Sequence, residues 1–73
     1  MRHFDVRDPF GFTHRVGIDS AGLHGAENLW HHVGEFVNGD KEAKRKLVNA
    51  IATALVYQRQ LPDGFTAQEV ACP

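Results

Sequence analysis

The residues best suited to chemistry are histidines and acidic residues in one segment. His24, Glu27, His31 and Glu35 are spaced three and four apart, so a helix would place them in one narrow polar arc. Three of these side chains, His24, Glu27 and His31, could ligate one divalent metal. A catalytic metal needs a concave and partly dry site, whereas an exposed helix face is convex. We therefore favour a solvated face with weak Glu–His pairs, and predict no metal site and no cofactor, with a metal-dependent protein as an alternative.

A nucleophilic active site is not evident in the sequence. None of the candidate nucleophiles lies in a Gly-x-Ser-x-Gly turn, and the glycines form neither a dinucleotide-binding pattern nor a P-loop. These candidates are Thr13, Ser20, Thr53, Thr66 and Cys72. The sequence thus predicts that the protein is not an enzyme.

A basic cluster stands at the start of the second predicted helix. Lys41, Lys44 and Arg45 oppose the helix macrodipole, which favours anions at that end, so local stability does not explain them. Together with free backbone N–H groups they could contact phosphate or an acidic protein surface. Direct DNA binding is therefore an alternative function, although the net charge of −1 disfavours it.

Aromatic and arginine side chains are concentrated in the first 15 residues. The candidate partner-binding residues are Phe4, Arg7, Phe10, Phe12 and Arg15. A two-helix core cannot comfortably cover every aromatic ring in the chain, and exposed aromatics beside arginines are typical of protein-interface anchors. The alternative is that this segment closes over the open side of the helices.

The N-terminal segment, 1–19, has the pattern of strands. Apolar residues alternate in 3–7 and 12–18, which indicates half-buried strands, and Asp8-Pro9-Phe10-Gly11 between them fits a type I turn. We expect an extended arm or a loose β-hairpin.

Two helices are predicted to follow, over 20–38 and 40–61. The apolar spacing of the first is helical, Asn38-Gly39 ends it, and Asp40 caps the second. The apolar stripe of the first helix comprises Leu23, Ala26, Leu29, Trp30, Val33, Phe36 and Val37. A connection this short makes the two helices antiparallel neighbours.

The tail, 62–73, begins with a proline and contains a capping box. Thr66 and Glu69 have its spacing, which predicts a short C-terminal helical turn. The expected fold is mainly α, with a small α+β fold possible: an antiparallel two-helix hairpin on which the N-terminal segment packs.

Composition sets the class of protein. The chain has 73 residues, of which 42% are apolar and 23% charged, which fits one globular domain. A single cysteine cannot form an internal disulfide, and no apolar run is long enough to span a bilayer. We expect a cytoplasmic monomer that does not bind membranes.

The whole chain resembles one group of small proteins. It opens with MRHFDVRDPF and carries AENLWHHVGEFVNGD ahead of a lysine-rich helix. In size and in these segments it is similar to small phage-encoded regulators of host RNA polymerase, in particular a transcription inhibitor and antiterminator of a Xanthomonas phage. The resemblance implies binding to bacterial RNA polymerase in the host cytoplasm, inhibition of initiation by sigma displacement, and antitermination. The leading prediction is therefore a protein-binding regulator of bacterial transcription.

Overall fold

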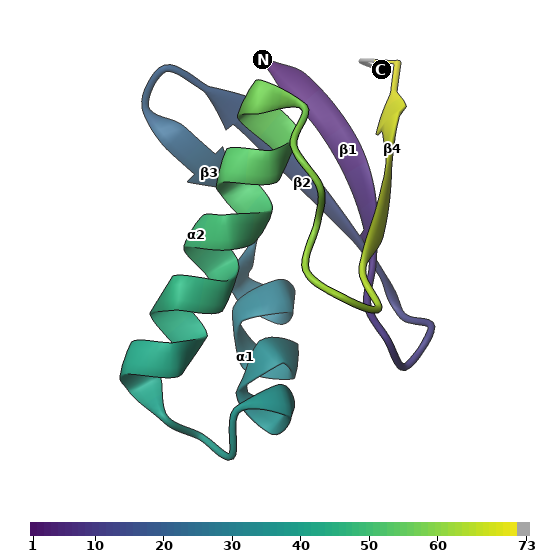
Figure 1. The fold of residues 1–73 in the computed structure, drawn as a ribbon. Coiled ribbons are helices and arrows are strands. Elements are labelled where there is room, and N and C mark those ends of the chain that lie inside the picture. Colours follow the sequence, from purple (N-terminus) through teal and green to yellow (C-terminus); the bar gives the residue numbers. More distant parts are fainter. Residues whose placement is uncertain (72–73) are drawn as a thin grey trace.

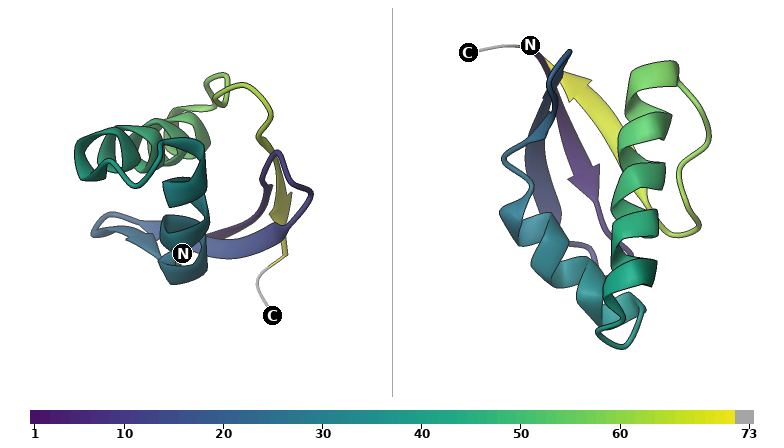
Figure 2. Two further views of the ribbon diagram at one scale, coloured as in Figure 1. Left: turned by 90° about the horizontal axis from the view of Figure 1, so that it is seen from below. Right: turned by 90° about the vertical axis from the view of Figure 1, so that its left-hand side faces the viewer.

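The chain forms a four-stranded antiparallel sheet with two helices on one of its faces (Figures 1 and 2). The sheet order is β3-β2-β1-β4. The elements are β1 (Arg2–Arg7), β2 (Thr13–Asp19), β3 (Gly22–His24), α1 (Glu27–Phe36), α2 (Lys41–Tyr57) and β4 (Thr66–Val70). This computed structural model describes residues 1–71, without the side chains of Asn28 and Phe36. The expectations for Phe36 and Cys72 therefore lie outside the described residues.

The N-terminal strands and the turn between them are confirmed. β1 and β2 pair in antiparallel register from Arg2 opposite Ile18 to Arg7 opposite Thr13. In the turn, the N–H of Gly11 donates to the carbonyl of Asp8 at 3.0 Å, and Gly11 adopts a φ of +92° that favours glycine. The alternation in the sequence thus reports a true hairpin, in which one face of each strand is buried.

The second helix is confirmed, but it is shorter than predicted. The carboxylate of Asp40 accepts hydrogen bonds from the N–H groups of Glu42 and Ala43, as its position before the helix predicts. The helix ends at Tyr57 rather than at residue 61, because Gln58 takes a left-handed conformation with a φ of +54°. The proline at position 62 therefore lies beyond the end of the helix and does not terminate it.

The first helix begins seven residues later than predicted. Residues 20–26 form a turn and the short strand β3, which pairs with β2, and the helix starts only at Glu27. Two glycines explain the difference, because Gly22 and Gly25 adopt positive φ values of +123° and +72° that a helix does not contain. The expected stop at Asn38-Gly39 is confirmed, since both residues have positive φ and the chain then turns into α2.

The predicted C-terminal helical turn is wrong. Residues Thr66–Val70 form β4, which pairs antiparallel with β1, so that His3 lies opposite Val70 and Arg7 lies opposite Thr66. Thr66 and Glu69 act as strand residues rather than as a capping box. Pairing with a strand 60 residues away gives no local signal in the sequence, and it overrides the weak local preference.

The mainly α helical hairpin is therefore also wrong, and the protein has a small α+β fold. Its core lies between the sheet and both helices (Figure 2). The buried core residues are Phe4, Val6, Val16, Ile18, Leu29, Val33, Ile51, Leu55 and Phe65. Trp30, expected in the first helix's apolar stripe, is 36% exposed, because Leu29 and Val33 face the core instead. In the described part of the chain, no helix has the length and apolarity needed to cross a membrane.

Candidate functional site

Three titratable side chains meet where the β1–β2 turn approaches α1. We call Asp8, His14 and His32 the turn cluster; one donor atom from each lies within 4.8 Å of the others. The Nε2 atom of His14 is 2.9 Å from Oδ2 of Asp8, and the Nδ1 atom of His32 is 3.6 Å from the same oxygen. The side chains of Asp8 and His14 are 0% and 5% exposed, and that of His32 is 34% exposed. The cluster is thus a buried pair with a half-open third member.

Asp8 is fixed in place by the turn it begins. Its Oδ1 atom accepts hydrogen bonds from the backbone N–H groups of Phe10, at 3.0 Å, and Phe12, at 2.9 Å. Burial alone would raise the pKa of Asp8, but the hydrogen bonds from His14 and from these two N–H groups outweigh burial and hold that pKa below its usual value. The carboxylate therefore stays charged, with Oδ2 directed at the two histidines.

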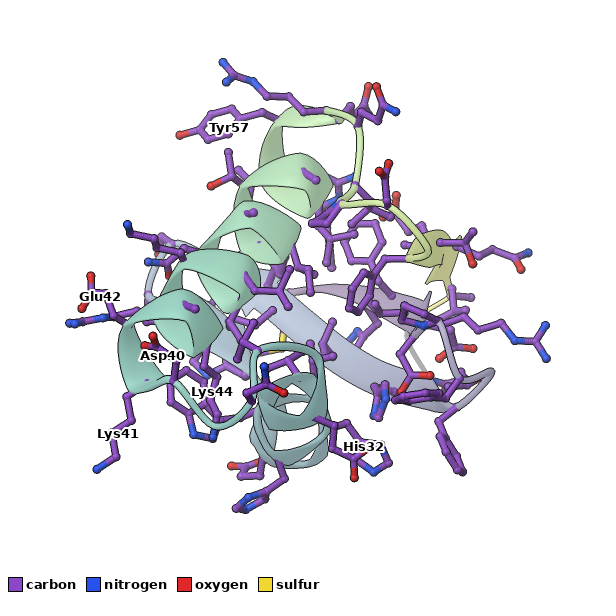
Figure 3. The ribbon with its side chains drawn as sticks, turned by 60° about the horizontal axis from the view of Figure 1, so that its bottom comes forward. His32, Asp40, Lys41, Glu42, Lys44 and Tyr57 are labelled. Atoms are coloured by element: carbon purple, nitrogen blue, oxygen red, sulfur yellow. The ribbon has the colours of Figure 1, made fainter. Side chains whose placement is uncertain are left out.

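His32 reaches the cluster from the helix α1. It follows Leu29 by three residues and so lies on the side of α1 that approaches the sheet. Its ring makes edge contacts with those of Phe12 and His14, at centroid distances of 5.0 Å and 4.9 Å. The Nδ1 atom is buried and has no hydrogen-bond partner among the described residues. Figure 3 shows this side chain at the side of α1, directed toward the β1–β2 turn.

Aromatic side chains lie on the outer side of the same turn. Phe10 and Phe12 are 59% and 56% exposed, although the backbone that carries them is held by Asp8. Arg7 is exposed at the end of β1, and its Nε atom donates to the carbonyl of Gly11 at 3.3 Å. We call Arg7, Phe10 and Phe12 the turn surface.

The five predicted partner-binding residues thus do not form one surface. Phe4 is 6% exposed and shares the helix-facing side of β1 with Val6, so it belongs to the core and not to an exposed surface. Arg15 lies on the opposite face of the sheet, where its Nε atom donates to Asp5 at 2.7 Å. Arg7, Phe10 and Phe12 remain together at the turn.

The metal ligands considered from the sequence are not brought together. His24 lies on β3, where its Nε2 atom is 2.9 Å from Asp19, while Glu27 and His31 lie on α1. Side chains of all three line one open hollow beside Trp30. Their donor atoms do not form a ligand group, since in the described part of the chain only the turn cluster has three such atoms within 4.8 Å. The spacing was helical, but the helix begins after His24.

The basic residues at the start of α2 do not converge on one place either. Lys44 lies over the ring of Trp30, with its Nζ atom 5.0 Å from the centroid, and Arg45 pairs with Glu42 at 2.6 Å. Lys41 projects away from the molecule, whereas Lys44 turns toward α1 (Figure 3). Two of the three cations therefore have contacts within the chain, and the arrangement gives little support to an anion site.

Reasoning from the sequence did not find the turn cluster. One of its three members, His14, could be recognised as buried, because it alternates in phase with Val16 and Ile18 and so belongs to the buried side of β2. A buried histidine calls for a polar partner, and Asp8, in the turn that leads into β2, is one of the acidic residues near it in the sequence. The position of His32 depends on how α1 packs against the turn, which no local pattern reports.

The fold and the site define the class of this protein as a small α+β domain with a buried Asp–His pair and an aromatic turn. Comparisons with protein-family models, with curated proteins and with solved structures gave no significant match.

Proposed function

We propose that this chain is a non-enzymatic, protein-binding regulator of bacterial transcription that docks through its turn surface. The observation that carries the proposal is the exposure of Phe10 and Phe12 on a turn that Asp8 holds rigid. Docking through this turn has a low entropic cost. Because the backbone of the turn is already held, a partner that buries the two rings does not have to order the loop as well.

The composition of the turn surface supports a protein partner. Aromatic residues and arginine are enriched at the centres of protein interfaces, and they account for most residues whose loss weakens binding strongly. Arg7 adds a cation to the same turn, where its Nε atom donates to the carbonyl of Gly11, and a cation there favours an acidic rim around an apolar pocket on the partner. Arg15, in contrast, is already paired with Asp5.

The choice of RNA polymerase as the partner comes from the resemblance of the sequence to small phage-encoded regulators. A regulator of that kind needs no reacting groups, and it acts by binding one state of the enzyme more tightly than another. Binding of the turn surface to the polymerase would displace the sigma factor, reduce initiation and promote antitermination.

Direct binding to purified bacterial RNA polymerase, from the Xanthomonas hosts that the resemblance implies, tests this proposal. Immobilised wild-type protein is compared with Phe12→Ala and with Tyr57→Ala, a matched control at the far end of α2 whose ring is 67% exposed. We expect Phe12→Ala to weaken binding about 30-fold, as the loss of a central aromatic contact does. Tyr57→Ala should bind as the wild type does.

The effect on transcription provides a second measurement. Wild-type protein should reduce promoter-dependent initiation and increase readthrough at a terminator, and Phe12→Ala should do neither at the same concentration. Failure of the wild type to bind the polymerase, or an equal loss in Phe12→Ala and Tyr57→Ala, would contradict the proposal. Binding to duplex DNA alone, with a steep loss of affinity as salt is added, would favour the DNA-binding alternative.

A further inference from the structure

We infer that the turn cluster is a binding site for a divalent transition-metal ion such as Zn²⁺, held by Oδ2 of Asp8, Nε2 of His14 and Nδ1 of His32. This site has a different role from the proposed docking surface, although the two adjoin, since Asp8 holds the backbone of the turn and the ring of Phe12 contacts that of His32. It is built from three elements, the β1–β2 turn, β2 and α1, which the ion would join.

The distances between the ligand atoms fit a metal of this size. Zinc lies about 2.0–2.2 Å from nitrogen and oxygen ligands, so that two ligands of a tetrahedral site are about 3.3 Å apart. The two distances from Oδ2 of Asp8, 2.9 Å to His14 and 3.6 Å to His32, lie on either side of that value. All three atoms lie within 4.8 Å of one another, so small side-chain rotations complete the geometry.

The buried Nδ1 atom of His32 is a second and independent observation. A buried polar atom without a partner costs free energy, and in native proteins it calls for an explanation such as strain, a catalytic role or a bound water or ion. This atom has no hydrogen-bond partner among the described residues, and it faces the Asp8 carboxylate from beyond hydrogen-bond distance. A cation between the two groups would give this nitrogen a ligand bond and balance the carboxylate charge.

The surroundings of the cluster resemble the supporting contacts of a metal site. Ligating carboxylates are commonly oriented by hydrogen bonds to their second oxygen, and the N–H groups of Phe10 and Phe12 do this for Asp8. The ring of Phe12 supports that of His32 through an edge contact. His32 remains 34% exposed, so an ion has a route of entry and a fourth ligand position can hold water.

Two imidazoles and one carboxylate favour a particular class of metal. Imidazole ligands suit zinc, copper, iron and nickel, whereas magnesium and calcium prefer sites made of oxygen atoms only. Zinc binding and the Asp8–His14 hydrogen bond are mutually exclusive uses of the same atoms. The alternative to the proposal is therefore that Asp8 and His14 serve only as a buried hydrogen-bonded pair in the hairpin.

Calorimetric titration of zinc into the full chain, freed of metal with EDTA, separates these two possibilities. Three variants are compared with the wild type: His32→Ala, Asp8→Asn, and the control His31→Ala, which removes the exposed neighbouring imidazole on the same helix. Asp8→Asn keeps an oxygen for the two backbone N–H groups but removes the anionic ligand. Circular dichroism confirms that each variant is folded, and His32→Ala can be made without opening the core because this side chain is half-exposed.

The proposal predicts one zinc ion per wild-type chain and no comparable binding of magnesium. Zinc affinity should fall by at least about tenfold in His32→Ala and in Asp8→Asn, and it should be unchanged in His31→Ala. Absence of zinc binding to the wild type would overturn the proposal. Binding that His31→Ala weakens as much as His32→Ala would also overturn it, since the ion would then be held by surface histidines.

Discussion

Two hairpin turns of this protein contain the same pair of residue types in different surroundings. At the β1–β2 turn, Asp8 contacts His14 at 2.9 Å, and at the β2–β3 turn, Asp19 contacts His24 at the same distance. Both aspartates also accept backbone N–H groups of their own turns. The first pair is buried, whereas the side chains of His24 and Asp19 are 45% and 35% exposed.

The comparison shows that the same Asp–His contact contributes differently to the free energy of unfolding when it is buried and when it is exposed. In an exposed pair, water competes with each partner and the net gain is small. In a buried pair, each group depends on the other, because no water replaces a lost partner. Only the buried turn has a third member, His32, which turns a hydrogen-bonded pair into a set of three possible ligands.

Removing the two aspartates one at a time is expected to give the largest difference between the turns. Asp8→Ala removes the acceptor that serves the buried His14 ring and the part-buried N–H groups of Phe10 and Phe12. We expect a loss of about 3 kcal/mol, the lower end of the range for a broken buried pair, because His32 beside it is one-third open to solvent. Asp19→Ala should cost far less. Urea unfolding monitored by circular dichroism measures both, and equal losses would contradict the comparison.

Zinc should stabilise the buried turn and leave the exposed one unaffected. At a free zinc concentration 100 times the dissociation constant, the stabilisation is about 2.7 kcal/mol. For a domain of this size, that raises the melting temperature by about 10–20 °C. Differential scanning fluorimetry should show this shift in the wild type and in His24→Ala, but not in His32→Ala. A shift in melting temperature that disappears in His24→Ala would place the ion at the β2–β3 turn and contradict the proposed site.

The glycines of the two turns should behave alike. Gly11 and Gly22 have φ values of +92° and +123°, and a Cβ at either position would meet no atom of the described residues within 4 Å. Conformational strain alone should therefore cost about 1–2 kcal/mol in Gly11→Ala and in Gly22→Ala. Similar urea midpoints for the two variants would show that backbone strain at the glycine is the same in the two turns. A much larger loss of stability in one variant would show that the backbone strain differs between the two turns.

The smallest predicted effect is the loss of stability in acid that comes from the exposed pair, Asp19 and His24. The hydrogen bond from His24, and then that from the N–H of Ala21, hold the pKa of Asp19 below its usual value. A lowered pKa in the folded state stabilises the protein above the unfolded pKa of about 4, and this contribution is lost as the pH falls through the lowered folded pKa. Asp19→Asn should therefore flatten the stability profile slightly below about pH 4. A change at neutral pH only would contradict this assignment.

The parts of the fold that local patterns determine were predictable from the sequence. Alternating apolar residues reported β1 and β2, Asp8-Pro9-Phe10-Gly11 reported the turn, and Asp40 reported the start of α2. β4 was missed because its stability comes from pairing with β1 rather than from its own residues. The start of α1 was misplaced because periodic apolar residues outweighed Gly22 and Gly25, whose positive φ values prevent the helix from beginning before Glu27.

The candidate site was predictable only in part, for the same reason. The turn surface was found through residue type, since Phe10 and Phe12 stand out in any reading of the first 15 residues. The metal ligands were sought on one helix, where spacing can be counted, but the three donors come from separate elements. Convergence of side chains from a turn, a strand and a helix is a property of the tertiary structure, and a single sequence does not report it.

Long-range ¹H–¹⁵N spectra of the five histidine rings, recorded on the wild-type chain with and without one equivalent of zinc, test the account most directly. The account predicts that the Nε2 resonance of His14 and the Nδ1 resonance of His32 move to the range of metal-bound nitrogen, while the rings of His24 and His31 stay unchanged. Zinc-induced shifts confined to His24 and His31, or no shift in any ring, would contradict it.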